Sequence, residues 1–365
     1  MKPPNTATAI FLVHFFTSFF LSLPCSTTAS SPALTALYAF GDSTDDPGNN
    51  NQLVTLFRSD HPPYGKDFPY QVPTGRFSDG KLSTDFIVSS LGLKDLLPAY
   101  LDPKLTTNDL LTGVSFASAG TGLDDLTAEL AGALKISSQL DYFDEAVTRM
   151  KGLVGEEKAK FIVENAIFII SVGSNDFMDN FYELPTRKFQ FSISGYQDFL
   201  LHELESAIQR LYNAGGRRFA IVGLPPIGCL PIQVTIGSLI PGKHMFQRVC
   251  VEQQNTDSIA YNIKLQSLIS RLKGSWAKGA KISYLDIYYP LEDMINNPSK
   301  YGFEETLRGC CGLGIVETGP LCDVMEATCN DASKYIFWDA VHPTQATYFF
   351  LAQTALQTVI PSLLP

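Results

Sequence analysis

The stretch Ala36–Asn51, with the sequence ALYAFGDSTDDPGNNN, decides the fold. Its apolar residues Ala36–Phe40 predict a short buried strand, which ends at the turn Gly41–Ser43. Because ligands of open α/β sheets bind beyond the carboxyl ends of the strands, Ser43 is placed for chemistry. A turn rich in Gly, Asp, Ser and Asn is by itself more often purely structural, so the remaining segments decide its role.

Four further apolar segments predict buried strands, and each is followed by Gly, Pro, Asp or Ser. They are Val114–Ala117, Ala166–Val172, Phe219–Val222 and Lys281–Leu285. Between them lie amphipathic stretches that predict helices, namely Ser138–Met150, Tyr196–Tyr212 and Met245–Leu272. Strands that alternate with helices predict an α/β fold with a parallel sheet covered on both faces.

The charge of the chain excludes one class of partner. The sequence has 365 residues, with 27 Lys and Arg against 37 Asp and Glu, so its formal net charge is −10. The chain is acidic and has no long run of basic or acidic residues. We therefore expect no binding of nucleic acid or of anionic lipid headgroups through charge.

The amino-terminal residues differ in composition from the rest. Lys2 precedes the apolar run Ala9–Leu23, and the small residues Ser26–Ser30 follow. This order predicts a secretory signal peptide over residues 1–29, cleaved near Ala29, while a retained membrane anchor is the alternative. We expect one domain over residues 30–365, with no integral membrane association after the signal is removed. The sequence does not indicate the oligomeric state.

The cysteines predict disulfides. Removal of Cys25 with the signal leaves six of the seven cysteines: Cys229, Cys250, Cys310, Cys311, Cys322 and Cys329. An even number in an exported chain favours disulfides, and no paired C-x-x-C pattern indicates a metal site. Adjacent cysteines seldom bond to each other. We therefore expect Cys229–Cys250, with Cys310 and Cys311 each bonded to one of Cys322 and Cys329 in either order.

Two glycine-containing turns supply candidate hydrogen-bond donors. The segment Gly113–Gly122 runs from a predicted strand into glycine-rich chain, where exposed backbone N–H groups are suited to an oxyanion. The segment Gly173–Asp176 follows another predicted strand and carries Asn175, whose side chain offers N–H groups at the same edge of the sheet. Each segment on its own is also compatible with an ordinary turn.

One histidine is a candidate base. His342 follows Asp339 by three residues, so that one helical turn brings the carboxylate beside the imidazole, where it can hold the ring in one tautomer. Such a pair is by itself usually incidental. No G-x-S-x-G elbow and no H-E-x-x-H motif occurs, which argues against the α/β-hydrolase and zinc-protease classes. A mechanism on Ser43 therefore requires the fold to bring His342 across to it.

Together these segments resemble the plant GDSL-type esterase/lipase family of SGNH hydrolases. The motifs that carry the resemblance are F-G-D-S-x-x-D-x-G-N-N from Phe40, G-V-x-F-A-S-x-G from Gly113, G-x-N-D from Gly173 and D-x-x-H-P from Asp339. The resemblance covers essentially all of the mature chain. It implies a three-layer α/β/α sandwich with a five-stranded parallel sheet, in agreement with the five predicted strands.

The resemblance also implies roles for single residues. Ser43 would be the nucleophile, His342 the general base and Asp339 the carboxylate that orients it. The oxyanion hole would consist of the backbone N–H groups of Ser43 and Gly120 and the side chain of Asn175. Neither a metal nor another cofactor is implied. Two residues depart from the family pattern, Thr44 in place of leucine and Ser115 in place of a frequent asparagine.

The implied activity is that of a secreted serine esterase or lipase, located in the cell wall or apoplast, which hydrolyses lipid or acyl esters. Acyl transfer to another hydroxyl, removal of acetyl groups from polysaccharide, and a binding protein without turnover remain alternatives. The apolar segment Leu230–Ile240 is a candidate for lining an acyl pocket, although a plain strand-to-helix connection is the favoured interpretation.

Overall fold

The computed structural model describes residue 1 and residues 34–242, 244–276 and 279–364. Apart from Met1, the expected signal peptide over residues 1–29 lies outside the described residues. The chain divides into two units, residues 1–31 and residues 32–365. All that follows concerns the second unit.

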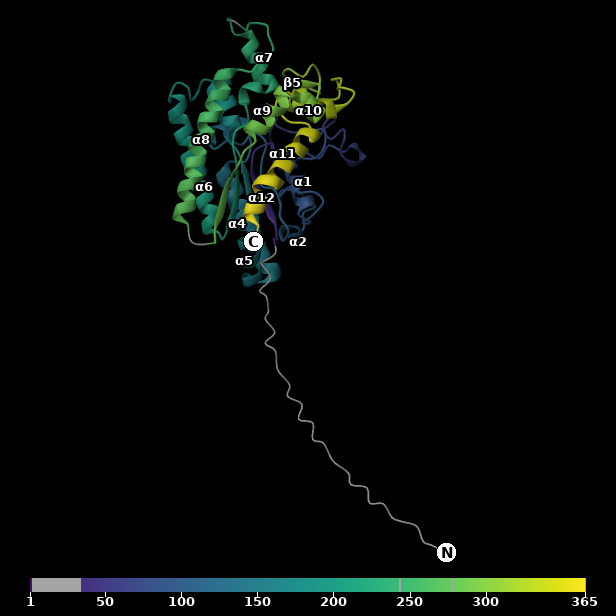
Figure 1. Ribbon diagram of the computed structural model, residues 1–365, viewed down its shortest axis with the longest axis vertical. Coiled ribbons are helices and arrows are strands. Elements are labelled where there is room, and N and C mark those ends of the chain that lie inside the picture. Colours follow the sequence, from purple (N-terminus) through teal and green to yellow (C-terminus); the bar gives the residue numbers. More distant parts are fainter. Residues whose placement is uncertain (2–33, 243, 277–278, 365) are drawn as a thin grey trace. The chain divides into compact units, whose positions relative to one another are not determined.

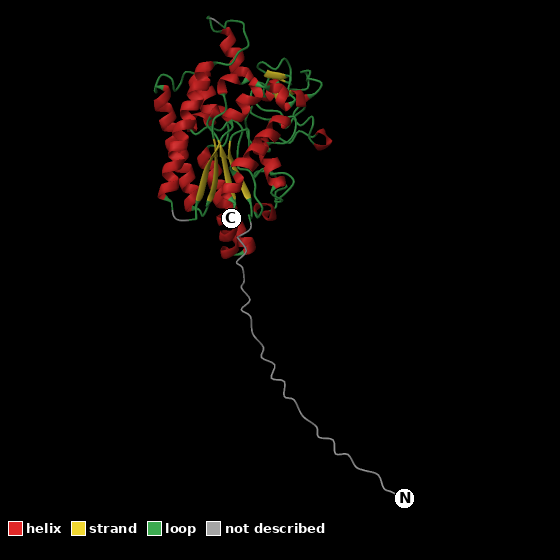
Figure 2. Ribbon diagram, in the orientation of Figure 1, coloured by secondary structure: helices red, strands yellow, loops and turns green. Residues whose placement is uncertain are grey.

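Four parallel strands form the central sheet, in the order β1-β2-β3-β4 (Figure 2). Their bounds are β1 Leu37–Gly41, β2 Ile167–Ser171, β3 Arg218–Val222 and β4 Lys281–Leu285. The register pairs Gly41 with Ser171, so that β1 and β2 end side by side at their carboxyl ends. Four of the five predicted strands are thereby confirmed.

The prediction of a fifth strand at Val114–Ala117 is wrong. This segment runs along the outer edge of β1 and donates from Phe116 N to Ala39 O over 2.8 Å, but it forms only isolated bridges. On its other side the carbonyls of Ser115 and Ala117 accept from the side-chain amide of Asn49, at 2.9 and 2.7 Å. Ser115 also pairs with backbone on this side, donating from its N to Pro98 O and accepting from Tyr100 N, both over 2.9 Å. Single bridges to separate segments thus take the place of a regular ladder.

Helices cover both faces of the sheet, as expected for three layers (Figure 1). Alternate residues of β1 point to opposite faces. Tyr38 and Phe40 pack in one apolar cluster with α4 Ile136–Val154, α6 Ile193–Asn213 and α8 Glu252–Ser275. Leu37 and Ala39 pack in a second cluster with α1 Ser83–Ser90, α11 Gln345–Thr358 and α12 Ile360–Leu363.

The remaining elements are short. They are the helices α2 Thr107–Leu110, α3 Asp125–Ala131, α5 Glu156–Glu164, α7 Pro231–Leu239, α9 Tyr288–Asn296 and α10 Pro298–Tyr301, and the strands β5 Glu305–Gly309 and β6 Tyr335–Phe337, which pair as a small parallel sheet. In the described ranges we find no helix with the length and apolarity needed to cross a membrane.

Two of the predicted helices are confirmed and the third begins later than expected. Ser138–Met150 lies within α4 and Tyr196–Tyr212 within α6. Helix α8 starts at Glu252 instead of Met245, because Phe246 adopts a φ of 63°, which a right-handed helix does not accommodate.

Three disulfides connect the six cysteines. Cys229–Cys250 is confirmed. The order that the sequence left open is Cys310–Cys329 and Cys311–Cys322. The latter two bonds hold the loop that precedes β6, and β6 leads directly into Asp339.

Candidate active site

Ser43 lies in the turn that follows β1. Gly41 has a φ of 130°, and a Cβ atom at this position would lie 1.8 Å from the carbonyl oxygen of Ser171, so only glycine fits. The side-chain amide of Gln139 donates to Gly41 O and accepts from Gly41 N, both at 2.9 Å. These contacts fix the end of β1 and with it the position of Ser43.

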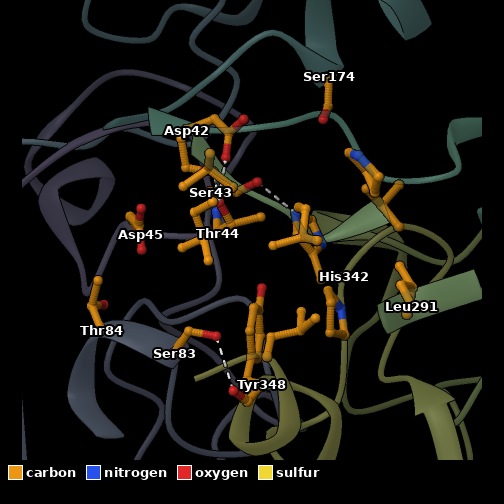
Figure 3. A pocket seen from close by; sticks show the side chains of 18 of the residues that line it. Asp42, Ser43, Thr44, Asp45, Ser83, Thr84, Ser174, Leu291, His342 and Tyr348 are labelled. Atoms are coloured by element: carbon orange, nitrogen blue, oxygen red, sulfur yellow. Dashed lines mark hydrogen bonds between the residues drawn. The ribbon is translucent and has the colours of Figure 1, made fainter. Parts of the chain in front are cut away.

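Ser43, His342 and Asp339 form a hydrogen-bonded series, of which Figure 3 shows the contact between Ser43 and His342. The Oγ atom of Ser43 lies 2.8 Å from His342 Nε2. His342 Nδ1 lies 2.7 Å from Asp339 Oδ2 on the other side of the ring. Ser43 and His342 are each 6% exposed and Asp339 is fully buried. Such a series lets the imidazole take the serine proton while the carboxylate stabilises the resulting charge.

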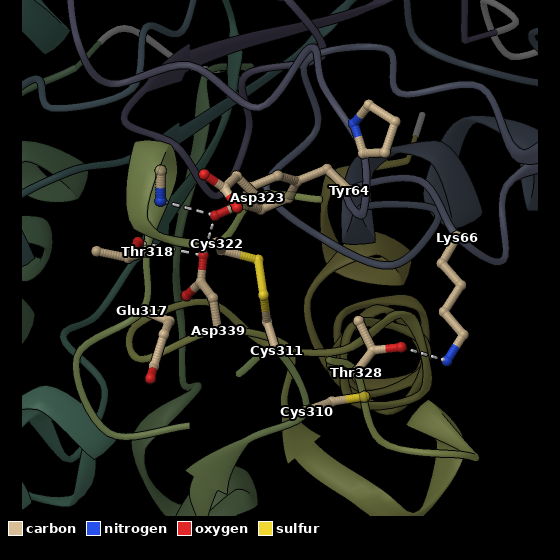
Figure 4. Close-up of a disulfide and its surroundings, with 12 residues drawn as sticks. Tyr64, Lys66, Cys310, Cys311, Glu317, Thr318, Cys322, Asp323, Thr328 and Asp339 are labelled. Atoms are coloured by element: carbon tan, nitrogen blue, oxygen red, sulfur yellow. Dashed lines mark hydrogen bonds between the residues drawn. A yellow bond between two sulfur atoms is a disulfide. The ribbon is translucent and has the colours of Figure 1, made fainter. Parts of the chain in front are cut away.

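Asp339 is held by more than His342. Its Oδ1 accepts from the backbone N–H groups of Val341 and His342, at 2.8 and 2.7 Å. Its Oδ2 accepts from the hydroxyl groups of Tyr64 at 2.7 Å and Thr318 at 3.2 Å (Figure 4). Burial by itself raises the pKa of Asp339, but the charge and the hydrogen bonds of His342, together with Tyr64, outweigh it and lower the pKa. The carboxylate therefore stays ionised beside the imidazole.

The three candidate oxyanion donors have different surroundings. The backbone N–H groups of Ser43 and Gly120 have no acceptor among the described residues. Asn175 donates one side-chain N–H to Thr121 O over 2.9 Å, which leaves its second N–H available. Gly120 has a φ of 88°, and a Cβ there would lie 2.5 Å from the Cβ of Ala131. Ser43 and Asn175 line one cavity with His342, whereas Gly120 is outside its lining.

Asp46 links the Ser43 turn to the loop that carries Gly120. Its Oδ1 accepts from Asn49 N at 2.6 Å and its Oδ2 from Ala119 N at 3.0 Å. The side chain of Asn50 donates to Ala119 O over 2.9 Å. Burial raises the pKa of Asp46 to about 6, against the lowering effect of these backbone N–H groups. The acidic and amide residues after Ser43 thus position the second donor loop.

Asp176 positions Asn175 in a similar way, through hydrogen bonds of its carboxylate. Its carboxylate accepts from Leu123 N at 2.8 Å, Asp124 N at 3.0 Å and the Thr127 hydroxyl at 2.6 Å. Burial raises the pKa of Asp176 to about 7, although these hydrogen bonds lower it. The residue next to Asn175 is therefore anchored to the chain that follows Gly120.

A cavity of about 90 Å³ begins at Ser43 and His342. It extends between the sheet face of β2 and β4 and the helices α1 and α11. Apolar side chains form most of its lining, including Ile87, Ile169, Leu285, Leu291, Leu351 and Ala355. A cavity with this lining is suited to an apolar ligand group. Of the segment Leu230–Ile240, only Leu230 lines it, and most of the segment forms α7.

Comparison with known proteins assigns the family. Residues 37–354 match the GDSL-like Lipase/Acylhydrolase family. The chain belongs to this family. GDSL esterase/lipase At2g40250 of Arabidopsis thaliana is 54% identical over 360 residues, which are 98% of this chain and 99% of the relative. GDSL esterase/lipase At2g31540, also of Arabidopsis thaliana, is 46% identical over 349 residues, which are 94% of this chain and 95% of the relative.

GDSL-like lipases/acylhydrolases are ester hydrolases, and the expected family is confirmed. The two departures from the family pattern have local roles in this chain. The hydroxyl of Thr44 donates to Asp42 Oδ1 over 2.8 Å. The hydroxyl of Ser115 donates to Asp45 O over 2.6 Å and accepts from Ala117 N. Both residues thus fix the loops around the site.

Sequence reasoning missed the residues that support this GDSL-family site. Tyr64 lies outside every motif named above, and its contact with Asp339 spans 275 positions. Asp46 and Asn49 belong to the quoted motif, but nothing in their spacing indicated that they hold the loop of Gly120. A detectable signal was the acidic residue that directly follows Asn175, since short acidic side chains often accept from nearby backbone N–H groups.

Proposed function

We propose that this protein is a secreted serine esterase or lipase that hydrolyses carboxylic esters through an acyl-enzyme on Ser43. The observation that carries the proposal is the series from Ser43 Oγ through His342 to Asp339, with separations of 2.8 and 2.7 Å. A serine is a weak nucleophile without an adjacent base, and His342 Nε2 is positioned to be that base.

In the first half of the reaction, Ser43 Oγ attacks the ester carbonyl carbon while its proton passes to His342 Nε2. Asp339 keeps the other ring nitrogen protonated and stabilises the imidazolium. The negative charge that develops on the carbonyl oxygen is stabilised by N–H groups of Ser43, Gly120 and Asn175. The tetrahedral intermediate then collapses, and the alkoxide leaves with the proton from His342.

In the second half, water takes the place of the departed alcohol. His342 Nε2 removes a proton from this water as its oxygen attacks the acyl carbon, and the same proton returns to Ser43 Oγ when the acid is released. Transfer of the acyl group to another alcohol would use the same steps with a hydroxyl in place of water. The residues of the site serve both reactions equally.

The cavity favours an acyl group longer than acetyl. Its apolar lining beyond Ser43 includes Ile87, Leu285 and Leu351, and an acetyl group would leave these side chains without a ligand. Each methylene group of the acyl chain that enters the cavity contributes about 0.8 kcal/mol of transfer free energy. We therefore favour hydrolysis of longer acyl esters over polysaccharide deacetylation as the function.

An activity panel tests this function. Wild-type protein and Ser43→Ala are assayed against p-nitrophenyl esters of increasing acyl length, acetylated glycans, and an acyl ester with an added acceptor alcohol. We expect hydrolysis of medium or long acyl esters by the wild type alone. No hydrolysis of any ester by the folded wild type would refute the proposal, and formation of a new ester in preference to free acid would favour acyl transfer.

Secretion is the second part of the proposal. It is supported by the composition of residues 1–29 and by three disulfides, which persist in oxidising compartments. We also propose that residues 30–365 form one domain located in the cell wall or apoplast. Amino-terminal sequencing of protein collected from the medium of expressing cells should begin near Ser30, whereas retention of residues 1–29 would contradict cleavage.

A further inference from the structure

The cavity next to Ser43 is apolar over most of its lining but carries one polar region. Tyr348 of α11 lines it, and its side chain points toward Thr44 and Ser43 (Figure 3). Tyr348 is only 2% exposed, and its hydroxyl has no hydrogen-bond partner in the described part of the chain. A buried hydroxyl without a partner destabilises the protein, so a ligand that pairs with it gains affinity.

Asp45 and Thr84 line the same cavity as Tyr348. Asp45 is 4% exposed and forms no ion pair with any described basic side chain. Burial, followed by the nearby charge of Asp42, raises the pKa of Asp45 to about 8. A protonated carboxyl group offers one O–H donor in addition to its acceptor oxygen.

The chemistry of this region selects one kind of ligand group. Apart from His342 at the Ser43 end, the cavity lining holds no basic side chain to bind an anion, and the described residues include no group of three or more His, Cys, Asp or Glu side chains that could hold a metal ion. Tyr348 and protonated Asp45 each both donate and accept hydrogen bonds. A neutral hydroxyl group does the same, and its carbon chain fits the apolar walls on either side.

We infer that Tyr348 and Asp45 form a subsite for a hydroxyl group on the acyl chain of the substrate, which makes the enzyme selective for esters of hydroxylated fatty acids. This inference rests on the proposed ester hydrolysis at Ser43. It adds that the hydroxyl must lie at a particular distance along the chain from the ester carbonyl, because both the reacting carbon and the subsite are fixed by the protein.

Positional isomers provide the sharpest test. The full secreted protein is assayed with methyl octanoate and with methyl hydroxyoctanoates that differ only in which carbon carries the hydroxyl. These isomers have nearly equal hydrophobicity, so differences among them report on hydrogen bonding. We expect kcat/KM for one position, or for two adjacent positions, to exceed that of the other isomers by at least about tenfold. Equal kcat/KM values for all isomers would overturn the subsite.

Variants connect the selectivity to the named residues. Tyr348→Phe and Asp45→Val each remove polar atoms at nearly constant volume, and each should lower the ratio of the best to the other isomers by about tenfold. Tyr261→Phe is the matched control, since Tyr261 is also a buried tyrosine with a partnerless hydroxyl but does not line the cavity. An unchanged ratio in Tyr348→Phe, or an equal drop in Tyr261→Phe, would refute the assignment.

Binding separates this inference from the proposed hydrolysis. Calorimetric titration of Ser43→Ala with the same methyl esters measures affinity without turnover. Tighter binding of the preferred isomer, lost in Ser43→Ala/Tyr348→Phe, would support the subsite even if the wild type hydrolysed no ester. Equal affinity for all isomers would refute the subsite even if the wild type were an active esterase.

Discussion

His342 Nε2 lies 2.8 Å from Ser43 Oγ, although 299 positions separate the two residues. Ser43 is fixed by the end of β1, and His342 by the turn between β6 and α11. The small sheet and its disulfides therefore matter for the proposed chemistry, because they hold His342 beside Ser43.

The first prediction concerns that pair. Ser43→Ala and His342→Ala should each lower kcat by several orders of magnitude, since each removes a group that works only with the other. The double variant should be barely slower than either single variant, because residues that act as one unit are strongly non-additive. Steady-state kinetics with one p-nitrophenyl ester measures all three. Losses that multiply in the double variant would contradict a shared mechanism.

The second prediction concerns Asn175. Asn175→Ala should lower kcat by about 10²–10³ with a smaller change in KM, because the side-chain N–H is needed where charge develops in the transition state. Asn175→Asp keeps the shape but removes the donor, and should be at least as slow. The Tm of each variant measures the stability lost with the hydrogen bond from the Asn175 side chain to Thr121 O. A kcat equal to that of the wild type would exclude Asn175 from the oxyanion hole.

The third prediction concerns Tyr64, whose hydroxyl donates to Asp339 Oδ2 and accepts from Gly319 N at 2.8 Å. Tyr64→Phe should lower kcat about ten- to a hundredfold, because a hydrogen bond to a charged group contributes about 1.5–3 kcal/mol. Tyr38→Phe is the control: Tyr38 is also fully buried, and its hydroxyl donates to Leu110 O instead of to a residue of the site. Equal kcat losses in both variants would indicate a general loss of stability instead.

The fourth prediction concerns the pH dependence of stability. Burial raises the pKa of Asp45 from 3.8 to about 8, with a further contribution from Asp42. Between these values the unfolded chain loses the proton while the folded protein retains it, so this carboxyl lowers the free energy of unfolding as the pH rises. Asp45→Asn removes the effect. Its Tm relative to the wild type should therefore increase from about pH 4 to about pH 8.

The control for this measurement is Asp95→Asn, at an exposed aspartate whose carboxylate meets solvent in both states. Its Tm difference from the wild type should stay constant over the same range. A Tm difference for Asp45→Asn that is flat or falls with pH would show that Asp45 is ionised in the folded protein.

The sequence was sufficient for residues whose role is set by local pattern. Apolar runs followed by glycine or aspartate predicted β1 to β4. Four motifs in order along the chain, one of them around Ser43, indicated the family. The fifth strand was predicted incorrectly because Val114–Ala117 is as apolar as a strand. Its outer partners are the side chain of Asn49 and the backbone of Pro98 and Tyr100, and no local periodicity reveals such contacts. The same limit applies to Tyr64, whose partner lies 275 positions away.

The cavity could not be predicted from the sequence either. The segment Leu230–Ile240 was considered for an acyl pocket because it is apolar, yet apolar residues of α1 and α11 form much of the actual wall. These residues are spaced as in any helix that packs on a sheet. Only their arrangement in three dimensions leaves a space between them, and a one-dimensional pattern carries no information about that space.

The most direct test of the central claim is covalent labelling with a fluorophosphonate, followed by peptide mapping by mass spectrometry. The wild type should be labelled at Ser43 alone, labelling should be lost in Ser43→Ala, and it should be much slower in His342→Ala. Labelling of a different residue in the wild type, or undiminished labelling of Ser43→Ala, would contradict the assignment of Ser43 as the nucleophile.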